Sequence, residues 1–366
     1  MAGAYVHIPF CKSRCLYCDF FSTTLLEKRE EYVLAVLKEI KERKDYVRER
    51  IDTVYFGGGT PSMLSGAQIE AILHGIRKTW EVWEEAEITL EANPGDISAE
   101  KAKVWHEIGV NRLSIGIQSF HDDLLRRIGR RHTAEEAVQA VQTVQEAGFD
   151  NVSIDLIYGL PGETMTAWKE DVEKALSLHI QHISAYGLMY EEGTVLTDML
   201  HRGEVTEADE EEANAMYDYL TDELAANGFE QYEVSNFALP ERRSKHNGSY
   251  WNGTPYIGLG AGAHSYDGED RRRWNVSDLE KYIQGEDYWE EEVLTKNDRY
   301  NERIMLSLRT KEGLKLSMLR SSMRGVCLES ARPYVERGLL KRDGDRLVAT
   351  REGLHILNRI IEDLMI

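Results

Sequence analysis

Residues 5–18 read YVHIPFCKSRCLYC, a short apolar segment that runs directly into three cysteines, Cys11, Cys15 and Cys18. The spacing is C-x3-C-x2-C, and no fourth cysteine lies nearby. Three thiolates can hold three irons of a cubane cluster and leave the fourth iron open to a small molecule. The alternative is structural zinc with His7 as a fourth ligand, but His7 lies inside the expected strand, and zinc sites more often carry C-x2-C pairs. The pattern therefore favours a 4Fe–4S cluster over zinc.

Outward from this segment, short apolar strands alternate with amphipathic helices up to about residue 236. We expect strands at 5–8, 54–56, 88–91, 112–117, 152–157, 183–188 and 231–234. We expect helices near 32–40, 68–78, 134–147, 168–178 and 213–227. Such alternation predicts an α/β fold with a parallel sheet, closed or partly closed into a barrel, and a site at the carboxyl ends of the strands.

The rest of the chain differs in style. Residues 237–299 are aromatic and glycine-rich, and we expect them to be irregular. Residues 300–366 predict two helices, a hairpin and a last helix, which together indicate a small winged-helix-like domain. Cys327 stands alone there, and we expect it to be a small buried hydrophobic residue.

Charge and composition limit the location and the partners. The chain has 366 residues and a net charge of −20, which disfavours nucleic acid as a partner. No stretch approaches the roughly 20 uncharged residues that span a bilayer, and the N-terminus lacks the features of a signal peptide. Clustered cysteines in such a protein indicate metal rather than disulfides. We therefore expect a cytoplasmic protein.

The cysteines gain meaning from a second motif, Gly57-Gly58-Gly59-Thr60-Pro61, which follows the second expected strand. Together the two motifs resemble the radical S-adenosylmethionine superfamily. The resemblance implies a partial (β/α)6 TIM-type barrel in which the open iron chelates S-adenosylmethionine, and glycines there allow close approach to the ligand. The stretches 5–11, 113–120 and 155–161 are similar to the coproporphyrinogen III dehydrogenase-like branch, whose C-terminal domain matches the small domain expected here.

The resemblance also implies which residues line the S-adenosylmethionine site. By motif they are Tyr5, Tyr17, Gly58, Gly59, Thr60, Glu91, Gln118, Arg130 and Asp155. Carboxylates can accept from ribose hydroxyls or offset the sulfonium charge, and a guanidinium can pair with the ligand carboxylate. Two alternatives stay open: the two carboxylates bond only to neighbouring backbone, or Arg127 or Arg131 takes the place of Arg130.

Two features divide this branch. The dehydrogenases carry a further cysteine two positions after the triplet and an N-terminal extension; here Phe20 stands at that position and the first strand begins at residue 5. Instead, His246-Asn247-Gly-Ser-Tyr250-Trp251 matches the H-N-x-x-Y-W motif of the haem chaperones of this branch. Imidazole is a good haem ligand, and Tyr250 and Trp251 offer flat apolar surface. The alternative is that these side chains only pack over the barrel, and His264 is the one other histidine to test.

The resemblance implies a haem chaperone that binds the cluster, S-adenosylmethionine and haem, receives electrons from a donor, and delivers haem to haem-requiring membrane respiratory enzymes. It allows a homodimer, and it names no catalytic residue. The alternative is an enzyme, an oxygen-independent coproporphyrinogen III dehydrogenase that forms protoporphyrinogen IX.

Overall fold

Six parallel strands form the first part of the protein in the computed structural model, which describes residues 1–366. They are adjacent in chain order: β1 (Ala2–Ile8), β2 (Ile51–Gly58), β3 (Val82–Ala92), β4 (Arg112–Gln118), β5 (Val152–Tyr158) and β6 (His182–Gly187). The helices between them are α1 (Arg29–Glu42), α2 (Gly66–Thr79), α3 (Ala99–Glu107), α4 (Asp122–Arg127), α5 (Ala134–Glu146) and α6 (Met165–Ser177). The predicted partial (β/α)6 barrel is confirmed.

Helix boundaries follow from capping residues. α2 and α5 begin at capping boxes, with Ser65 and Thr133 as the N-cap residues, because each hydroxyl accepts from the backbone three residues on. α5 ends before Gly148, whose φ of 100° suits a glycine. The helices bury one apolar stripe each against the outer face of the sheet, and the large core they form includes Trp105 and Trp168.

Side chains alternate across each strand, so the barrel has an apolar outer face and a polar interior. In β4, Leu113, Ile115 and Ile117 are fully buried in the core under the helices. The other set, which begins at Arg112 and ends at Gln118, faces the interior. Polar groups therefore line the inside of the barrel, and each of them needs a partner or a ligand.

The last expected strand of the alternation differs in direction. β7 (Glu230–Glu233) is present, but it pairs antiparallel with β8 (Asn236–Ala238), which in turn pairs antiparallel with β6. Only two residues join β7 to β8, which is enough for a tight reversal and too few for a helical crossover. Helices α7 (Val195–His201) and α8 (Glu210–Ala226) precede this pair.

The segment 237–299 is regular, so the expectation of irregular structure was wrong. It contains α9 (Lys245–Asn252), β9 (Tyr256–Leu259), β10 (His264–Tyr266), β11 (Arg271–Asn275), α10 (Leu279–Gln284) and β12 (Trp289–Val293). β9 pairs parallel with β1, and the next three strands extend the sheet antiparallel to twelve strands. β11 and β12 lack apolar alternation and carry arginines and glutamates instead, with an ion pair across the strands between Arg271 and Glu291 at 2.9 Å.

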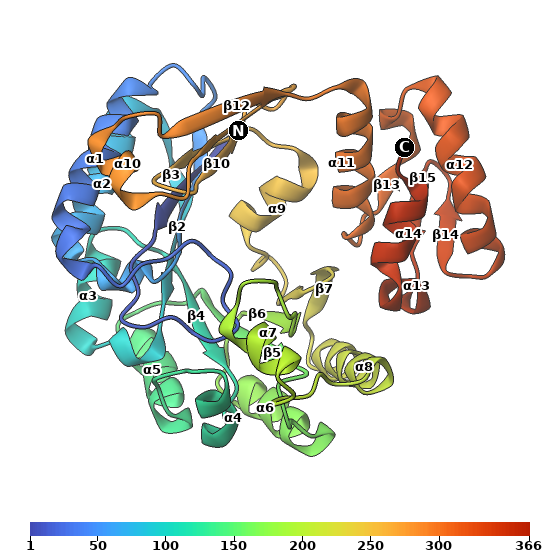
Figure 1. The fold of residues 1–366 in the computed structure, drawn as a ribbon, viewed down its shortest axis with the longest axis horizontal. Coiled ribbons are helices and arrows are strands. Elements are labelled where there is room, and N and C mark those ends of the chain that lie inside the picture. Colours follow the sequence, from blue (N-terminus) through green and yellow to red (C-terminus); the bar gives the residue numbers. More distant parts are fainter.

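Figure 1 shows that the curved sheet does not close and that α9 lies inside its concave side. α9 packs against β1, β2 and α11 (Lys296–Leu308). The C-terminal part then adds β13 (Leu314–Lys315), α12 (Ser321–Glu336), β14 (Leu340–Asp343), β15 (Arg346–Ala349), α13 (Arg351–His355) and α14 (Leu357–Leu364), around a core of its own. That core holds Cys327, fully buried as expected. None of the helices has the length and apolar character needed to span a bilayer.

Candidate functional site

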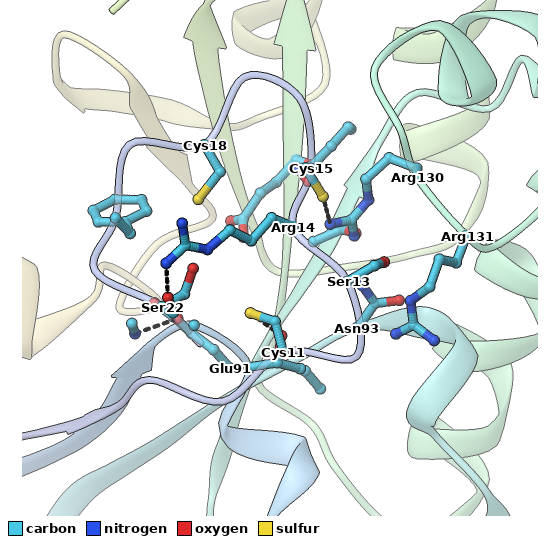
Figure 2. A pocket seen from close by; sticks show the side chains of 18 of the residues that line it. Cys11, Ser13, Arg14, Cys15, Cys18, Ser22, Glu91, Asn93, Arg130 and Arg131 are labelled. Atoms are coloured by element: carbon cyan, nitrogen blue, oxygen red, sulfur yellow. Dashed lines mark hydrogen bonds between the residues drawn. The ribbon is translucent and has the colours of Figure 1, made fainter. Parts of the chain in front are cut away.

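The three clustered cysteines lie on a loop between β1 and α1. Backbone hydrogen bonds fix this loop: Cys11 donates to Thr23, and Leu16 donates to Ile128 and accepts from Leu196. Figure 2 shows that the thiol groups of Cys11, Cys15 and Cys18 turn toward one shared cavity. The loop therefore presents three sulfurs to one space at the carboxyl end of the barrel.

Two side chains from elsewhere in the barrel approach the sulfurs. The Thr60 hydroxyl lies 3.3 Å from Cys11 Sγ, and Arg130 Nη1 donates to Cys15 Sγ at 3.4 Å. Burial raises the pKa of Cys11 and that of Cys18, the latter to about 11, so deprotonation of these thiols must accompany cation binding. Hydrogen bonds to ligating sulfurs tune the potential of an iron–sulfur cluster.

The donor set suits a cluster better than a single ion. No three His, Cys, Asp or Glu side chains gather closely enough to ligate one metal ion. His7, the candidate fourth zinc ligand, is buried, with Nε2 2.9 Å from the Phe21 carbonyl and Nδ1 3.2 Å from the Tyr5 hydroxyl. Three sulfurs spread around one cavity, with no fourth protein ligand, match a cubane with an open iron.

The glycines at the end of β2 have a packing reason of their own. Gly58 has a φ of 110°, and a Cβ there would lie 2.5 Å from the His7 ring. A Cβ at Gly59 would lie 2.8 Å from the Pro9 carbonyl carbon. The chain ends of β1 and β2 thus approach too closely for any side chain, and the Gly58 amide is free to donate to Glu91 Oε2 at 3.1 Å.

Two half-buried carboxylates face the same cavity. Glu91, near the end of β3, also accepts from the Tyr55 hydroxyl at 2.7 Å, and Asp155 on β5 accepts from Ser114 Oγ at 3.2 Å. Burial raises the pKa of Asp155, and it raises the pKa of Glu91 to about 7. Neither carboxylate is bonded only to neighbouring backbone, so both can still accept from a ligand.

The cavity joins the cysteines to nearly all of the residues predicted for S-adenosylmethionine. Its volume is about 850 Å³ including the open mouth. Its walls include all three cysteines and the predicted residues Tyr17, Gly58, Gly59, Thr60, Glu91, Gln118, Arg130 and Asp155. Tyr5 is not in the wall: it lies beneath, stacked on Tyr55 at 6.1 Å between ring centroids.

Of the three arginines considered, Arg130 and Arg131 line the cavity, and Arg127 does not. Arg130 also donates to the Gly116 carbonyl, and its Nε has no partner. Arg131 is engaged with the buried Asp96 at 3.5 Å. Both arginines therefore remain candidates to pair with a ligand carboxylate, and Arg130 is the one that also contacts a cysteine sulfur.

Sequence reasoning missed several wall residues. Ser114 and Gly116 line the cavity, and alternation along β4 from Gln118 could have found both. Gln118 itself has a φ of 71°, a strained value for a side-chain-bearing residue, and its amide joins Tyr17 and Asp155. Nothing in the sequence marked Arg112, which is 1 % exposed and has no partner for Nε or Nη1. Its positive charge lowers the pKa of Glu91 and of Asp155, although the larger effect of burial raises both.

The H-N-x-x-Y-W motif forms most of α9, away from the cysteines. His246 is 1 % exposed, with Nδ1 2.8 Å from Thr53 Oγ1 and Nε2 2.9 Å from the Tyr250 hydroxyl. Burial lowers its pKa to about 3. Asn247, Tyr250 and Trp251 are half-buried, and Trp251 Nε1 has no partner. His246 thus fills a polar socket, whereas the rest of the motif reaches the surface.

The other singled-out residues lie elsewhere. Phe20 is 64 % exposed and borders the mouth of the cavity. His264 on β10 is exposed and stacks on Trp274 at 6.0 Å. Neither joins the α9 socket.

Comparisons with known proteins agree along the whole chain. Residues 5–175 match the model of the radical SAM superfamily, and residues 294–356 match that of the HemN C-terminal domain. "Heme chaperone HemW" of Lactococcus lactis is 38% identical over 100% of this chain and 97% of its own, and its namesake in Bacillus subtilis is 35% identical over 98% of each. The solved coproporphyrinogen III oxidase HemN of Escherichia coli superposes with a TM-score of 0.85 at 23% identity, covering 100% of this chain and 90% of that one.

Proposed function

The chain belongs to the HemW family of haem chaperones, which carries a radical SAM domain, and from this premise we propose that it binds a 4Fe–4S cluster, S-adenosylmethionine and haem and delivers haem to haem-requiring respiratory enzymes. The observation that supports the cofactor part is the shared cavity, which joins three thiols with two carboxylates and an arginine. Each of these groups has a defined task toward a cationic, zwitterionic ligand.

We assign the cluster to Cys11, Cys15 and Cys18. A bound, reduced cluster would supply single electrons to the sulfonium of S-adenosylmethionine. The protein would hold the cluster by three thiolates and modulate it through Thr60 and Arg130, which already contact two of the sulfurs. A docked electron donor is part of the proposal.

For S-adenosylmethionine, the ligand carboxylate would pair with Arg130, whose guanidinium lines the cavity beside Cys15. Glu91 and Asp155 would accept from the ligand's hydroxyl or amino groups and offset its positive charge. Tyr17, Gln118 and the glycine segment would close the walls, and Tyr5 would support them from below.

For haem, we propose contact with the motif of α9. Trp251 and Tyr250 are half-buried aromatic residues of α9, the helix on the concave side of the sheet (Figure 1), and Asn247 is half-buried on the same helix. His246 can ligate the iron only after it leaves Thr53 or Tyr250, because both ring nitrogens are engaged. Each lost hydrogen bond costs about 1 kcal/mol, which iron ligation can offset.

The experiment uses anaerobically reconstituted protein in two arms. In the first, haem uptake is followed by the Soret band in wild type, His246→Ala, Trp251→Ala and, as a control, His264→Ala. We expect weaker uptake in the two α9 variants and unchanged uptake in the control. Uptake that depends on His264 alone, or no uptake in wild type, would contradict the proposed haem site.

In the second arm, coproporphyrinogen III is incubated with the protein, S-adenosylmethionine and a reductant. We expect no porphyrin product, because the position two residues after Cys18 holds Phe20 and offers no further thiol. Chromatographic detection of protoporphyrinogen IX at a catalytic rate would replace the chaperone with the dehydrogenase.

A further inference from the structure

Helix α9 is anchored inside the barrel at both its backbone and its first buried side chain. The Glu87 carboxylate of β3 accepts from the backbone amides of Lys245 and His246, both at 3.0 Å. The His246 ring then reaches Thr53 of β2, as described above. An eight-residue helix at the open side of the barrel is thereby tied to two of the strands whose ends form the cavity.

Within this socket the His246 ring packs on Tyr55, whose hydroxyl donates to Glu91 in the cavity wall. Its ring centroid lies 5.0 Å from that of Tyr55, with the planes 24° apart, and 6.3 Å from that of Tyr5. Tyr5 and Tyr55 also stack on each other. The three rings form one aromatic cluster in which each is a neighbour of the other two, and removal of the histidine takes one ring neighbour away from Tyr55.

The Tyr55 hydroxyl is the group that holds the Glu91 carboxylate. Glu91 accepts from it at 2.7 Å and from the Gly58 amide at 3.1 Å, and both Glu91 and Gly58 are in the cavity wall. A continuous series of direct contacts therefore runs from α9 to the cavity, through His246, Tyr55 and Glu91. His246 and Tyr55 are buried, so water cannot readily take the place of a displaced partner at either of them.

We propose that His246 is a positioning residue for the S-adenosylmethionine cavity, acting through Tyr55 on Glu91, so that haem and S-adenosylmethionine each weaken binding of the other. The proposal rests on the proposed assignment of these two ligands to the chain. With His246 in its socket, Tyr55 is fixed and Glu91 is held toward the cavity. With His246 turned out to ligate iron, Tyr55 is released.

The charge of Glu91 gives this contact a measurable effect. Burial raises the pKa of Glu91, the Tyr55 hydrogen bond lowers it, Asp155 raises it, and the Gly58 amide and Arg112 lower it. Since the resulting pKa is about 7, loss of the Tyr55 contact leaves more of this carboxyl protonated at neutral pH. A protonated Glu91 no longer offsets a sulfonium charge.

The effect of haem on S-adenosylmethionine binding and the reverse effect are equal in size, because the two binding equilibria are linked. If haem lowers the affinity for S-adenosylmethionine by some factor, S-adenosylmethionine lowers the affinity for haem by the same factor. A chaperone with this property would hold haem less tightly once S-adenosylmethionine is bound, which favours release.

The test measures S-adenosylmethionine affinity by equilibrium dialysis in cluster-reconstituted protein, across pH, for wild type, His246→Ala, Tyr55→Phe and His182→Ala. His182 is a matched control: it is fully buried and both its ring nitrogens are bonded, to Ser153 at 2.7 Å and Tyr232 at 2.8 Å. We expect roughly tenfold weaker binding in His246→Ala and Tyr55→Phe, with the pH dependence displaced upward, as for one lost charge-assisted hydrogen bond, and wild-type affinity in His182→Ala.

Wild-type affinity and an unchanged pH profile in His246→Ala with a full cluster would overturn the proposal. Tyr55→Phe keeps the aromatic ring but removes the hydroxyl that donates to Glu91, so it tests this hydrogen bond even where His246→Ala fails to fold. Haem titrations with and without saturating S-adenosylmethionine should show the same factor as the reciprocal experiment, and independent affinities would also overturn it. Failure of the haem-site assignment is distinct, because it would show as absent haem uptake with the S-adenosylmethionine results intact.

Discussion

The mouth of the barrel and the socket of α9 both contain polar side chains, but they differ in whether these side chains already have hydrogen-bond partners within the protein. At the mouth, the three thiols and the guanidinium of Arg130 line an open cavity. In the socket, His246 has a partner for each ring nitrogen, and Glu87 accepts from two amides. Polar residues inside a barrel thus divide into groups left for a ligand and groups satisfied by the protein itself.

The largest expected effect is loss of the cluster at the mouth of the barrel, with the α9 socket left intact. Cys11→Ser removes one of three cluster ligands, so we expect the iron–sulfur absorbance of reconstituted protein to be lost, while haem binding survives at least in part. Cys327→Ser is the control, since that thiol is buried in the C-terminal core and should leave the absorbance intact. Loss of haem binding together with the cluster, in a variant that is still folded, would show that the two regions are one site.

A second substitution, at Glu91, tests how the charge of this carboxylate affects the stability of the protein. The pKa of Glu91 is about 7 in the folded protein and 4.5 as an ordinary value, so the folded state binds more protons between these limits. Glu91 therefore makes the cluster-free protein lose stability as pH rises from about 4.5 to 7. In Glu91→Gln, urea unfolding at several pH values should show a smaller loss over this range.

Exposed Glu84→Gln should keep the wild-type dependence of unfolding free energy on pH. An identical pH dependence in Glu91→Gln and wild type would mean that this carboxylate is ionised in the protein without a ligand, contrary to its burial.

The smallest expected effect concerns the socket. Glu87→Gln removes the negative charge that two amides of α9 donate to, and we expect the free energy of unfolding to fall by about 1–3 kcal/mol, with faster hydrogen exchange in α9. Glu85→Gln, at an exposed position of the same strand, is the control. Unchanged exchange in α9 would show that Glu87 does not anchor the helix.

Local pattern was enough to predict the part of the fold with strong periodicity. The alternation up to β6 predicted the parallel strands and the helices α1, α2, α5 and α6, whereas α3 and α4 were not expected. The strands β9 to β12 were not predicted because they are short. β12 also carries acidic residues, one of which pairs with an arginine of the neighbouring strand. Their stability depends on partners distant in sequence, which local periodicity does not show.

The candidate site divides in the same way. The cysteine spacing and the family resemblance together predicted half of the cavity wall, 11 of its 22 residues, because neighbouring strand ends bring them together. Tyr55, Thr53 and Glu87 were missed, since their importance comes from what α9 places beside them. For His246 the motif gave a candidate ligand, and only the structure shows that both ring nitrogens are already bonded.

The most direct test of the proposed chaperone is haem transfer. Protein loaded with cluster, S-adenosylmethionine and haem is mixed with respiratory membranes depleted of haem, and recovery of oxidase activity is compared with that given by free haem at equal concentration. The account predicts faster recovery from the loaded protein, and slower recovery when Trp251→Ala carries the haem. Recovery no faster than with free haem, from protein that binds haem, would contradict a role in delivery.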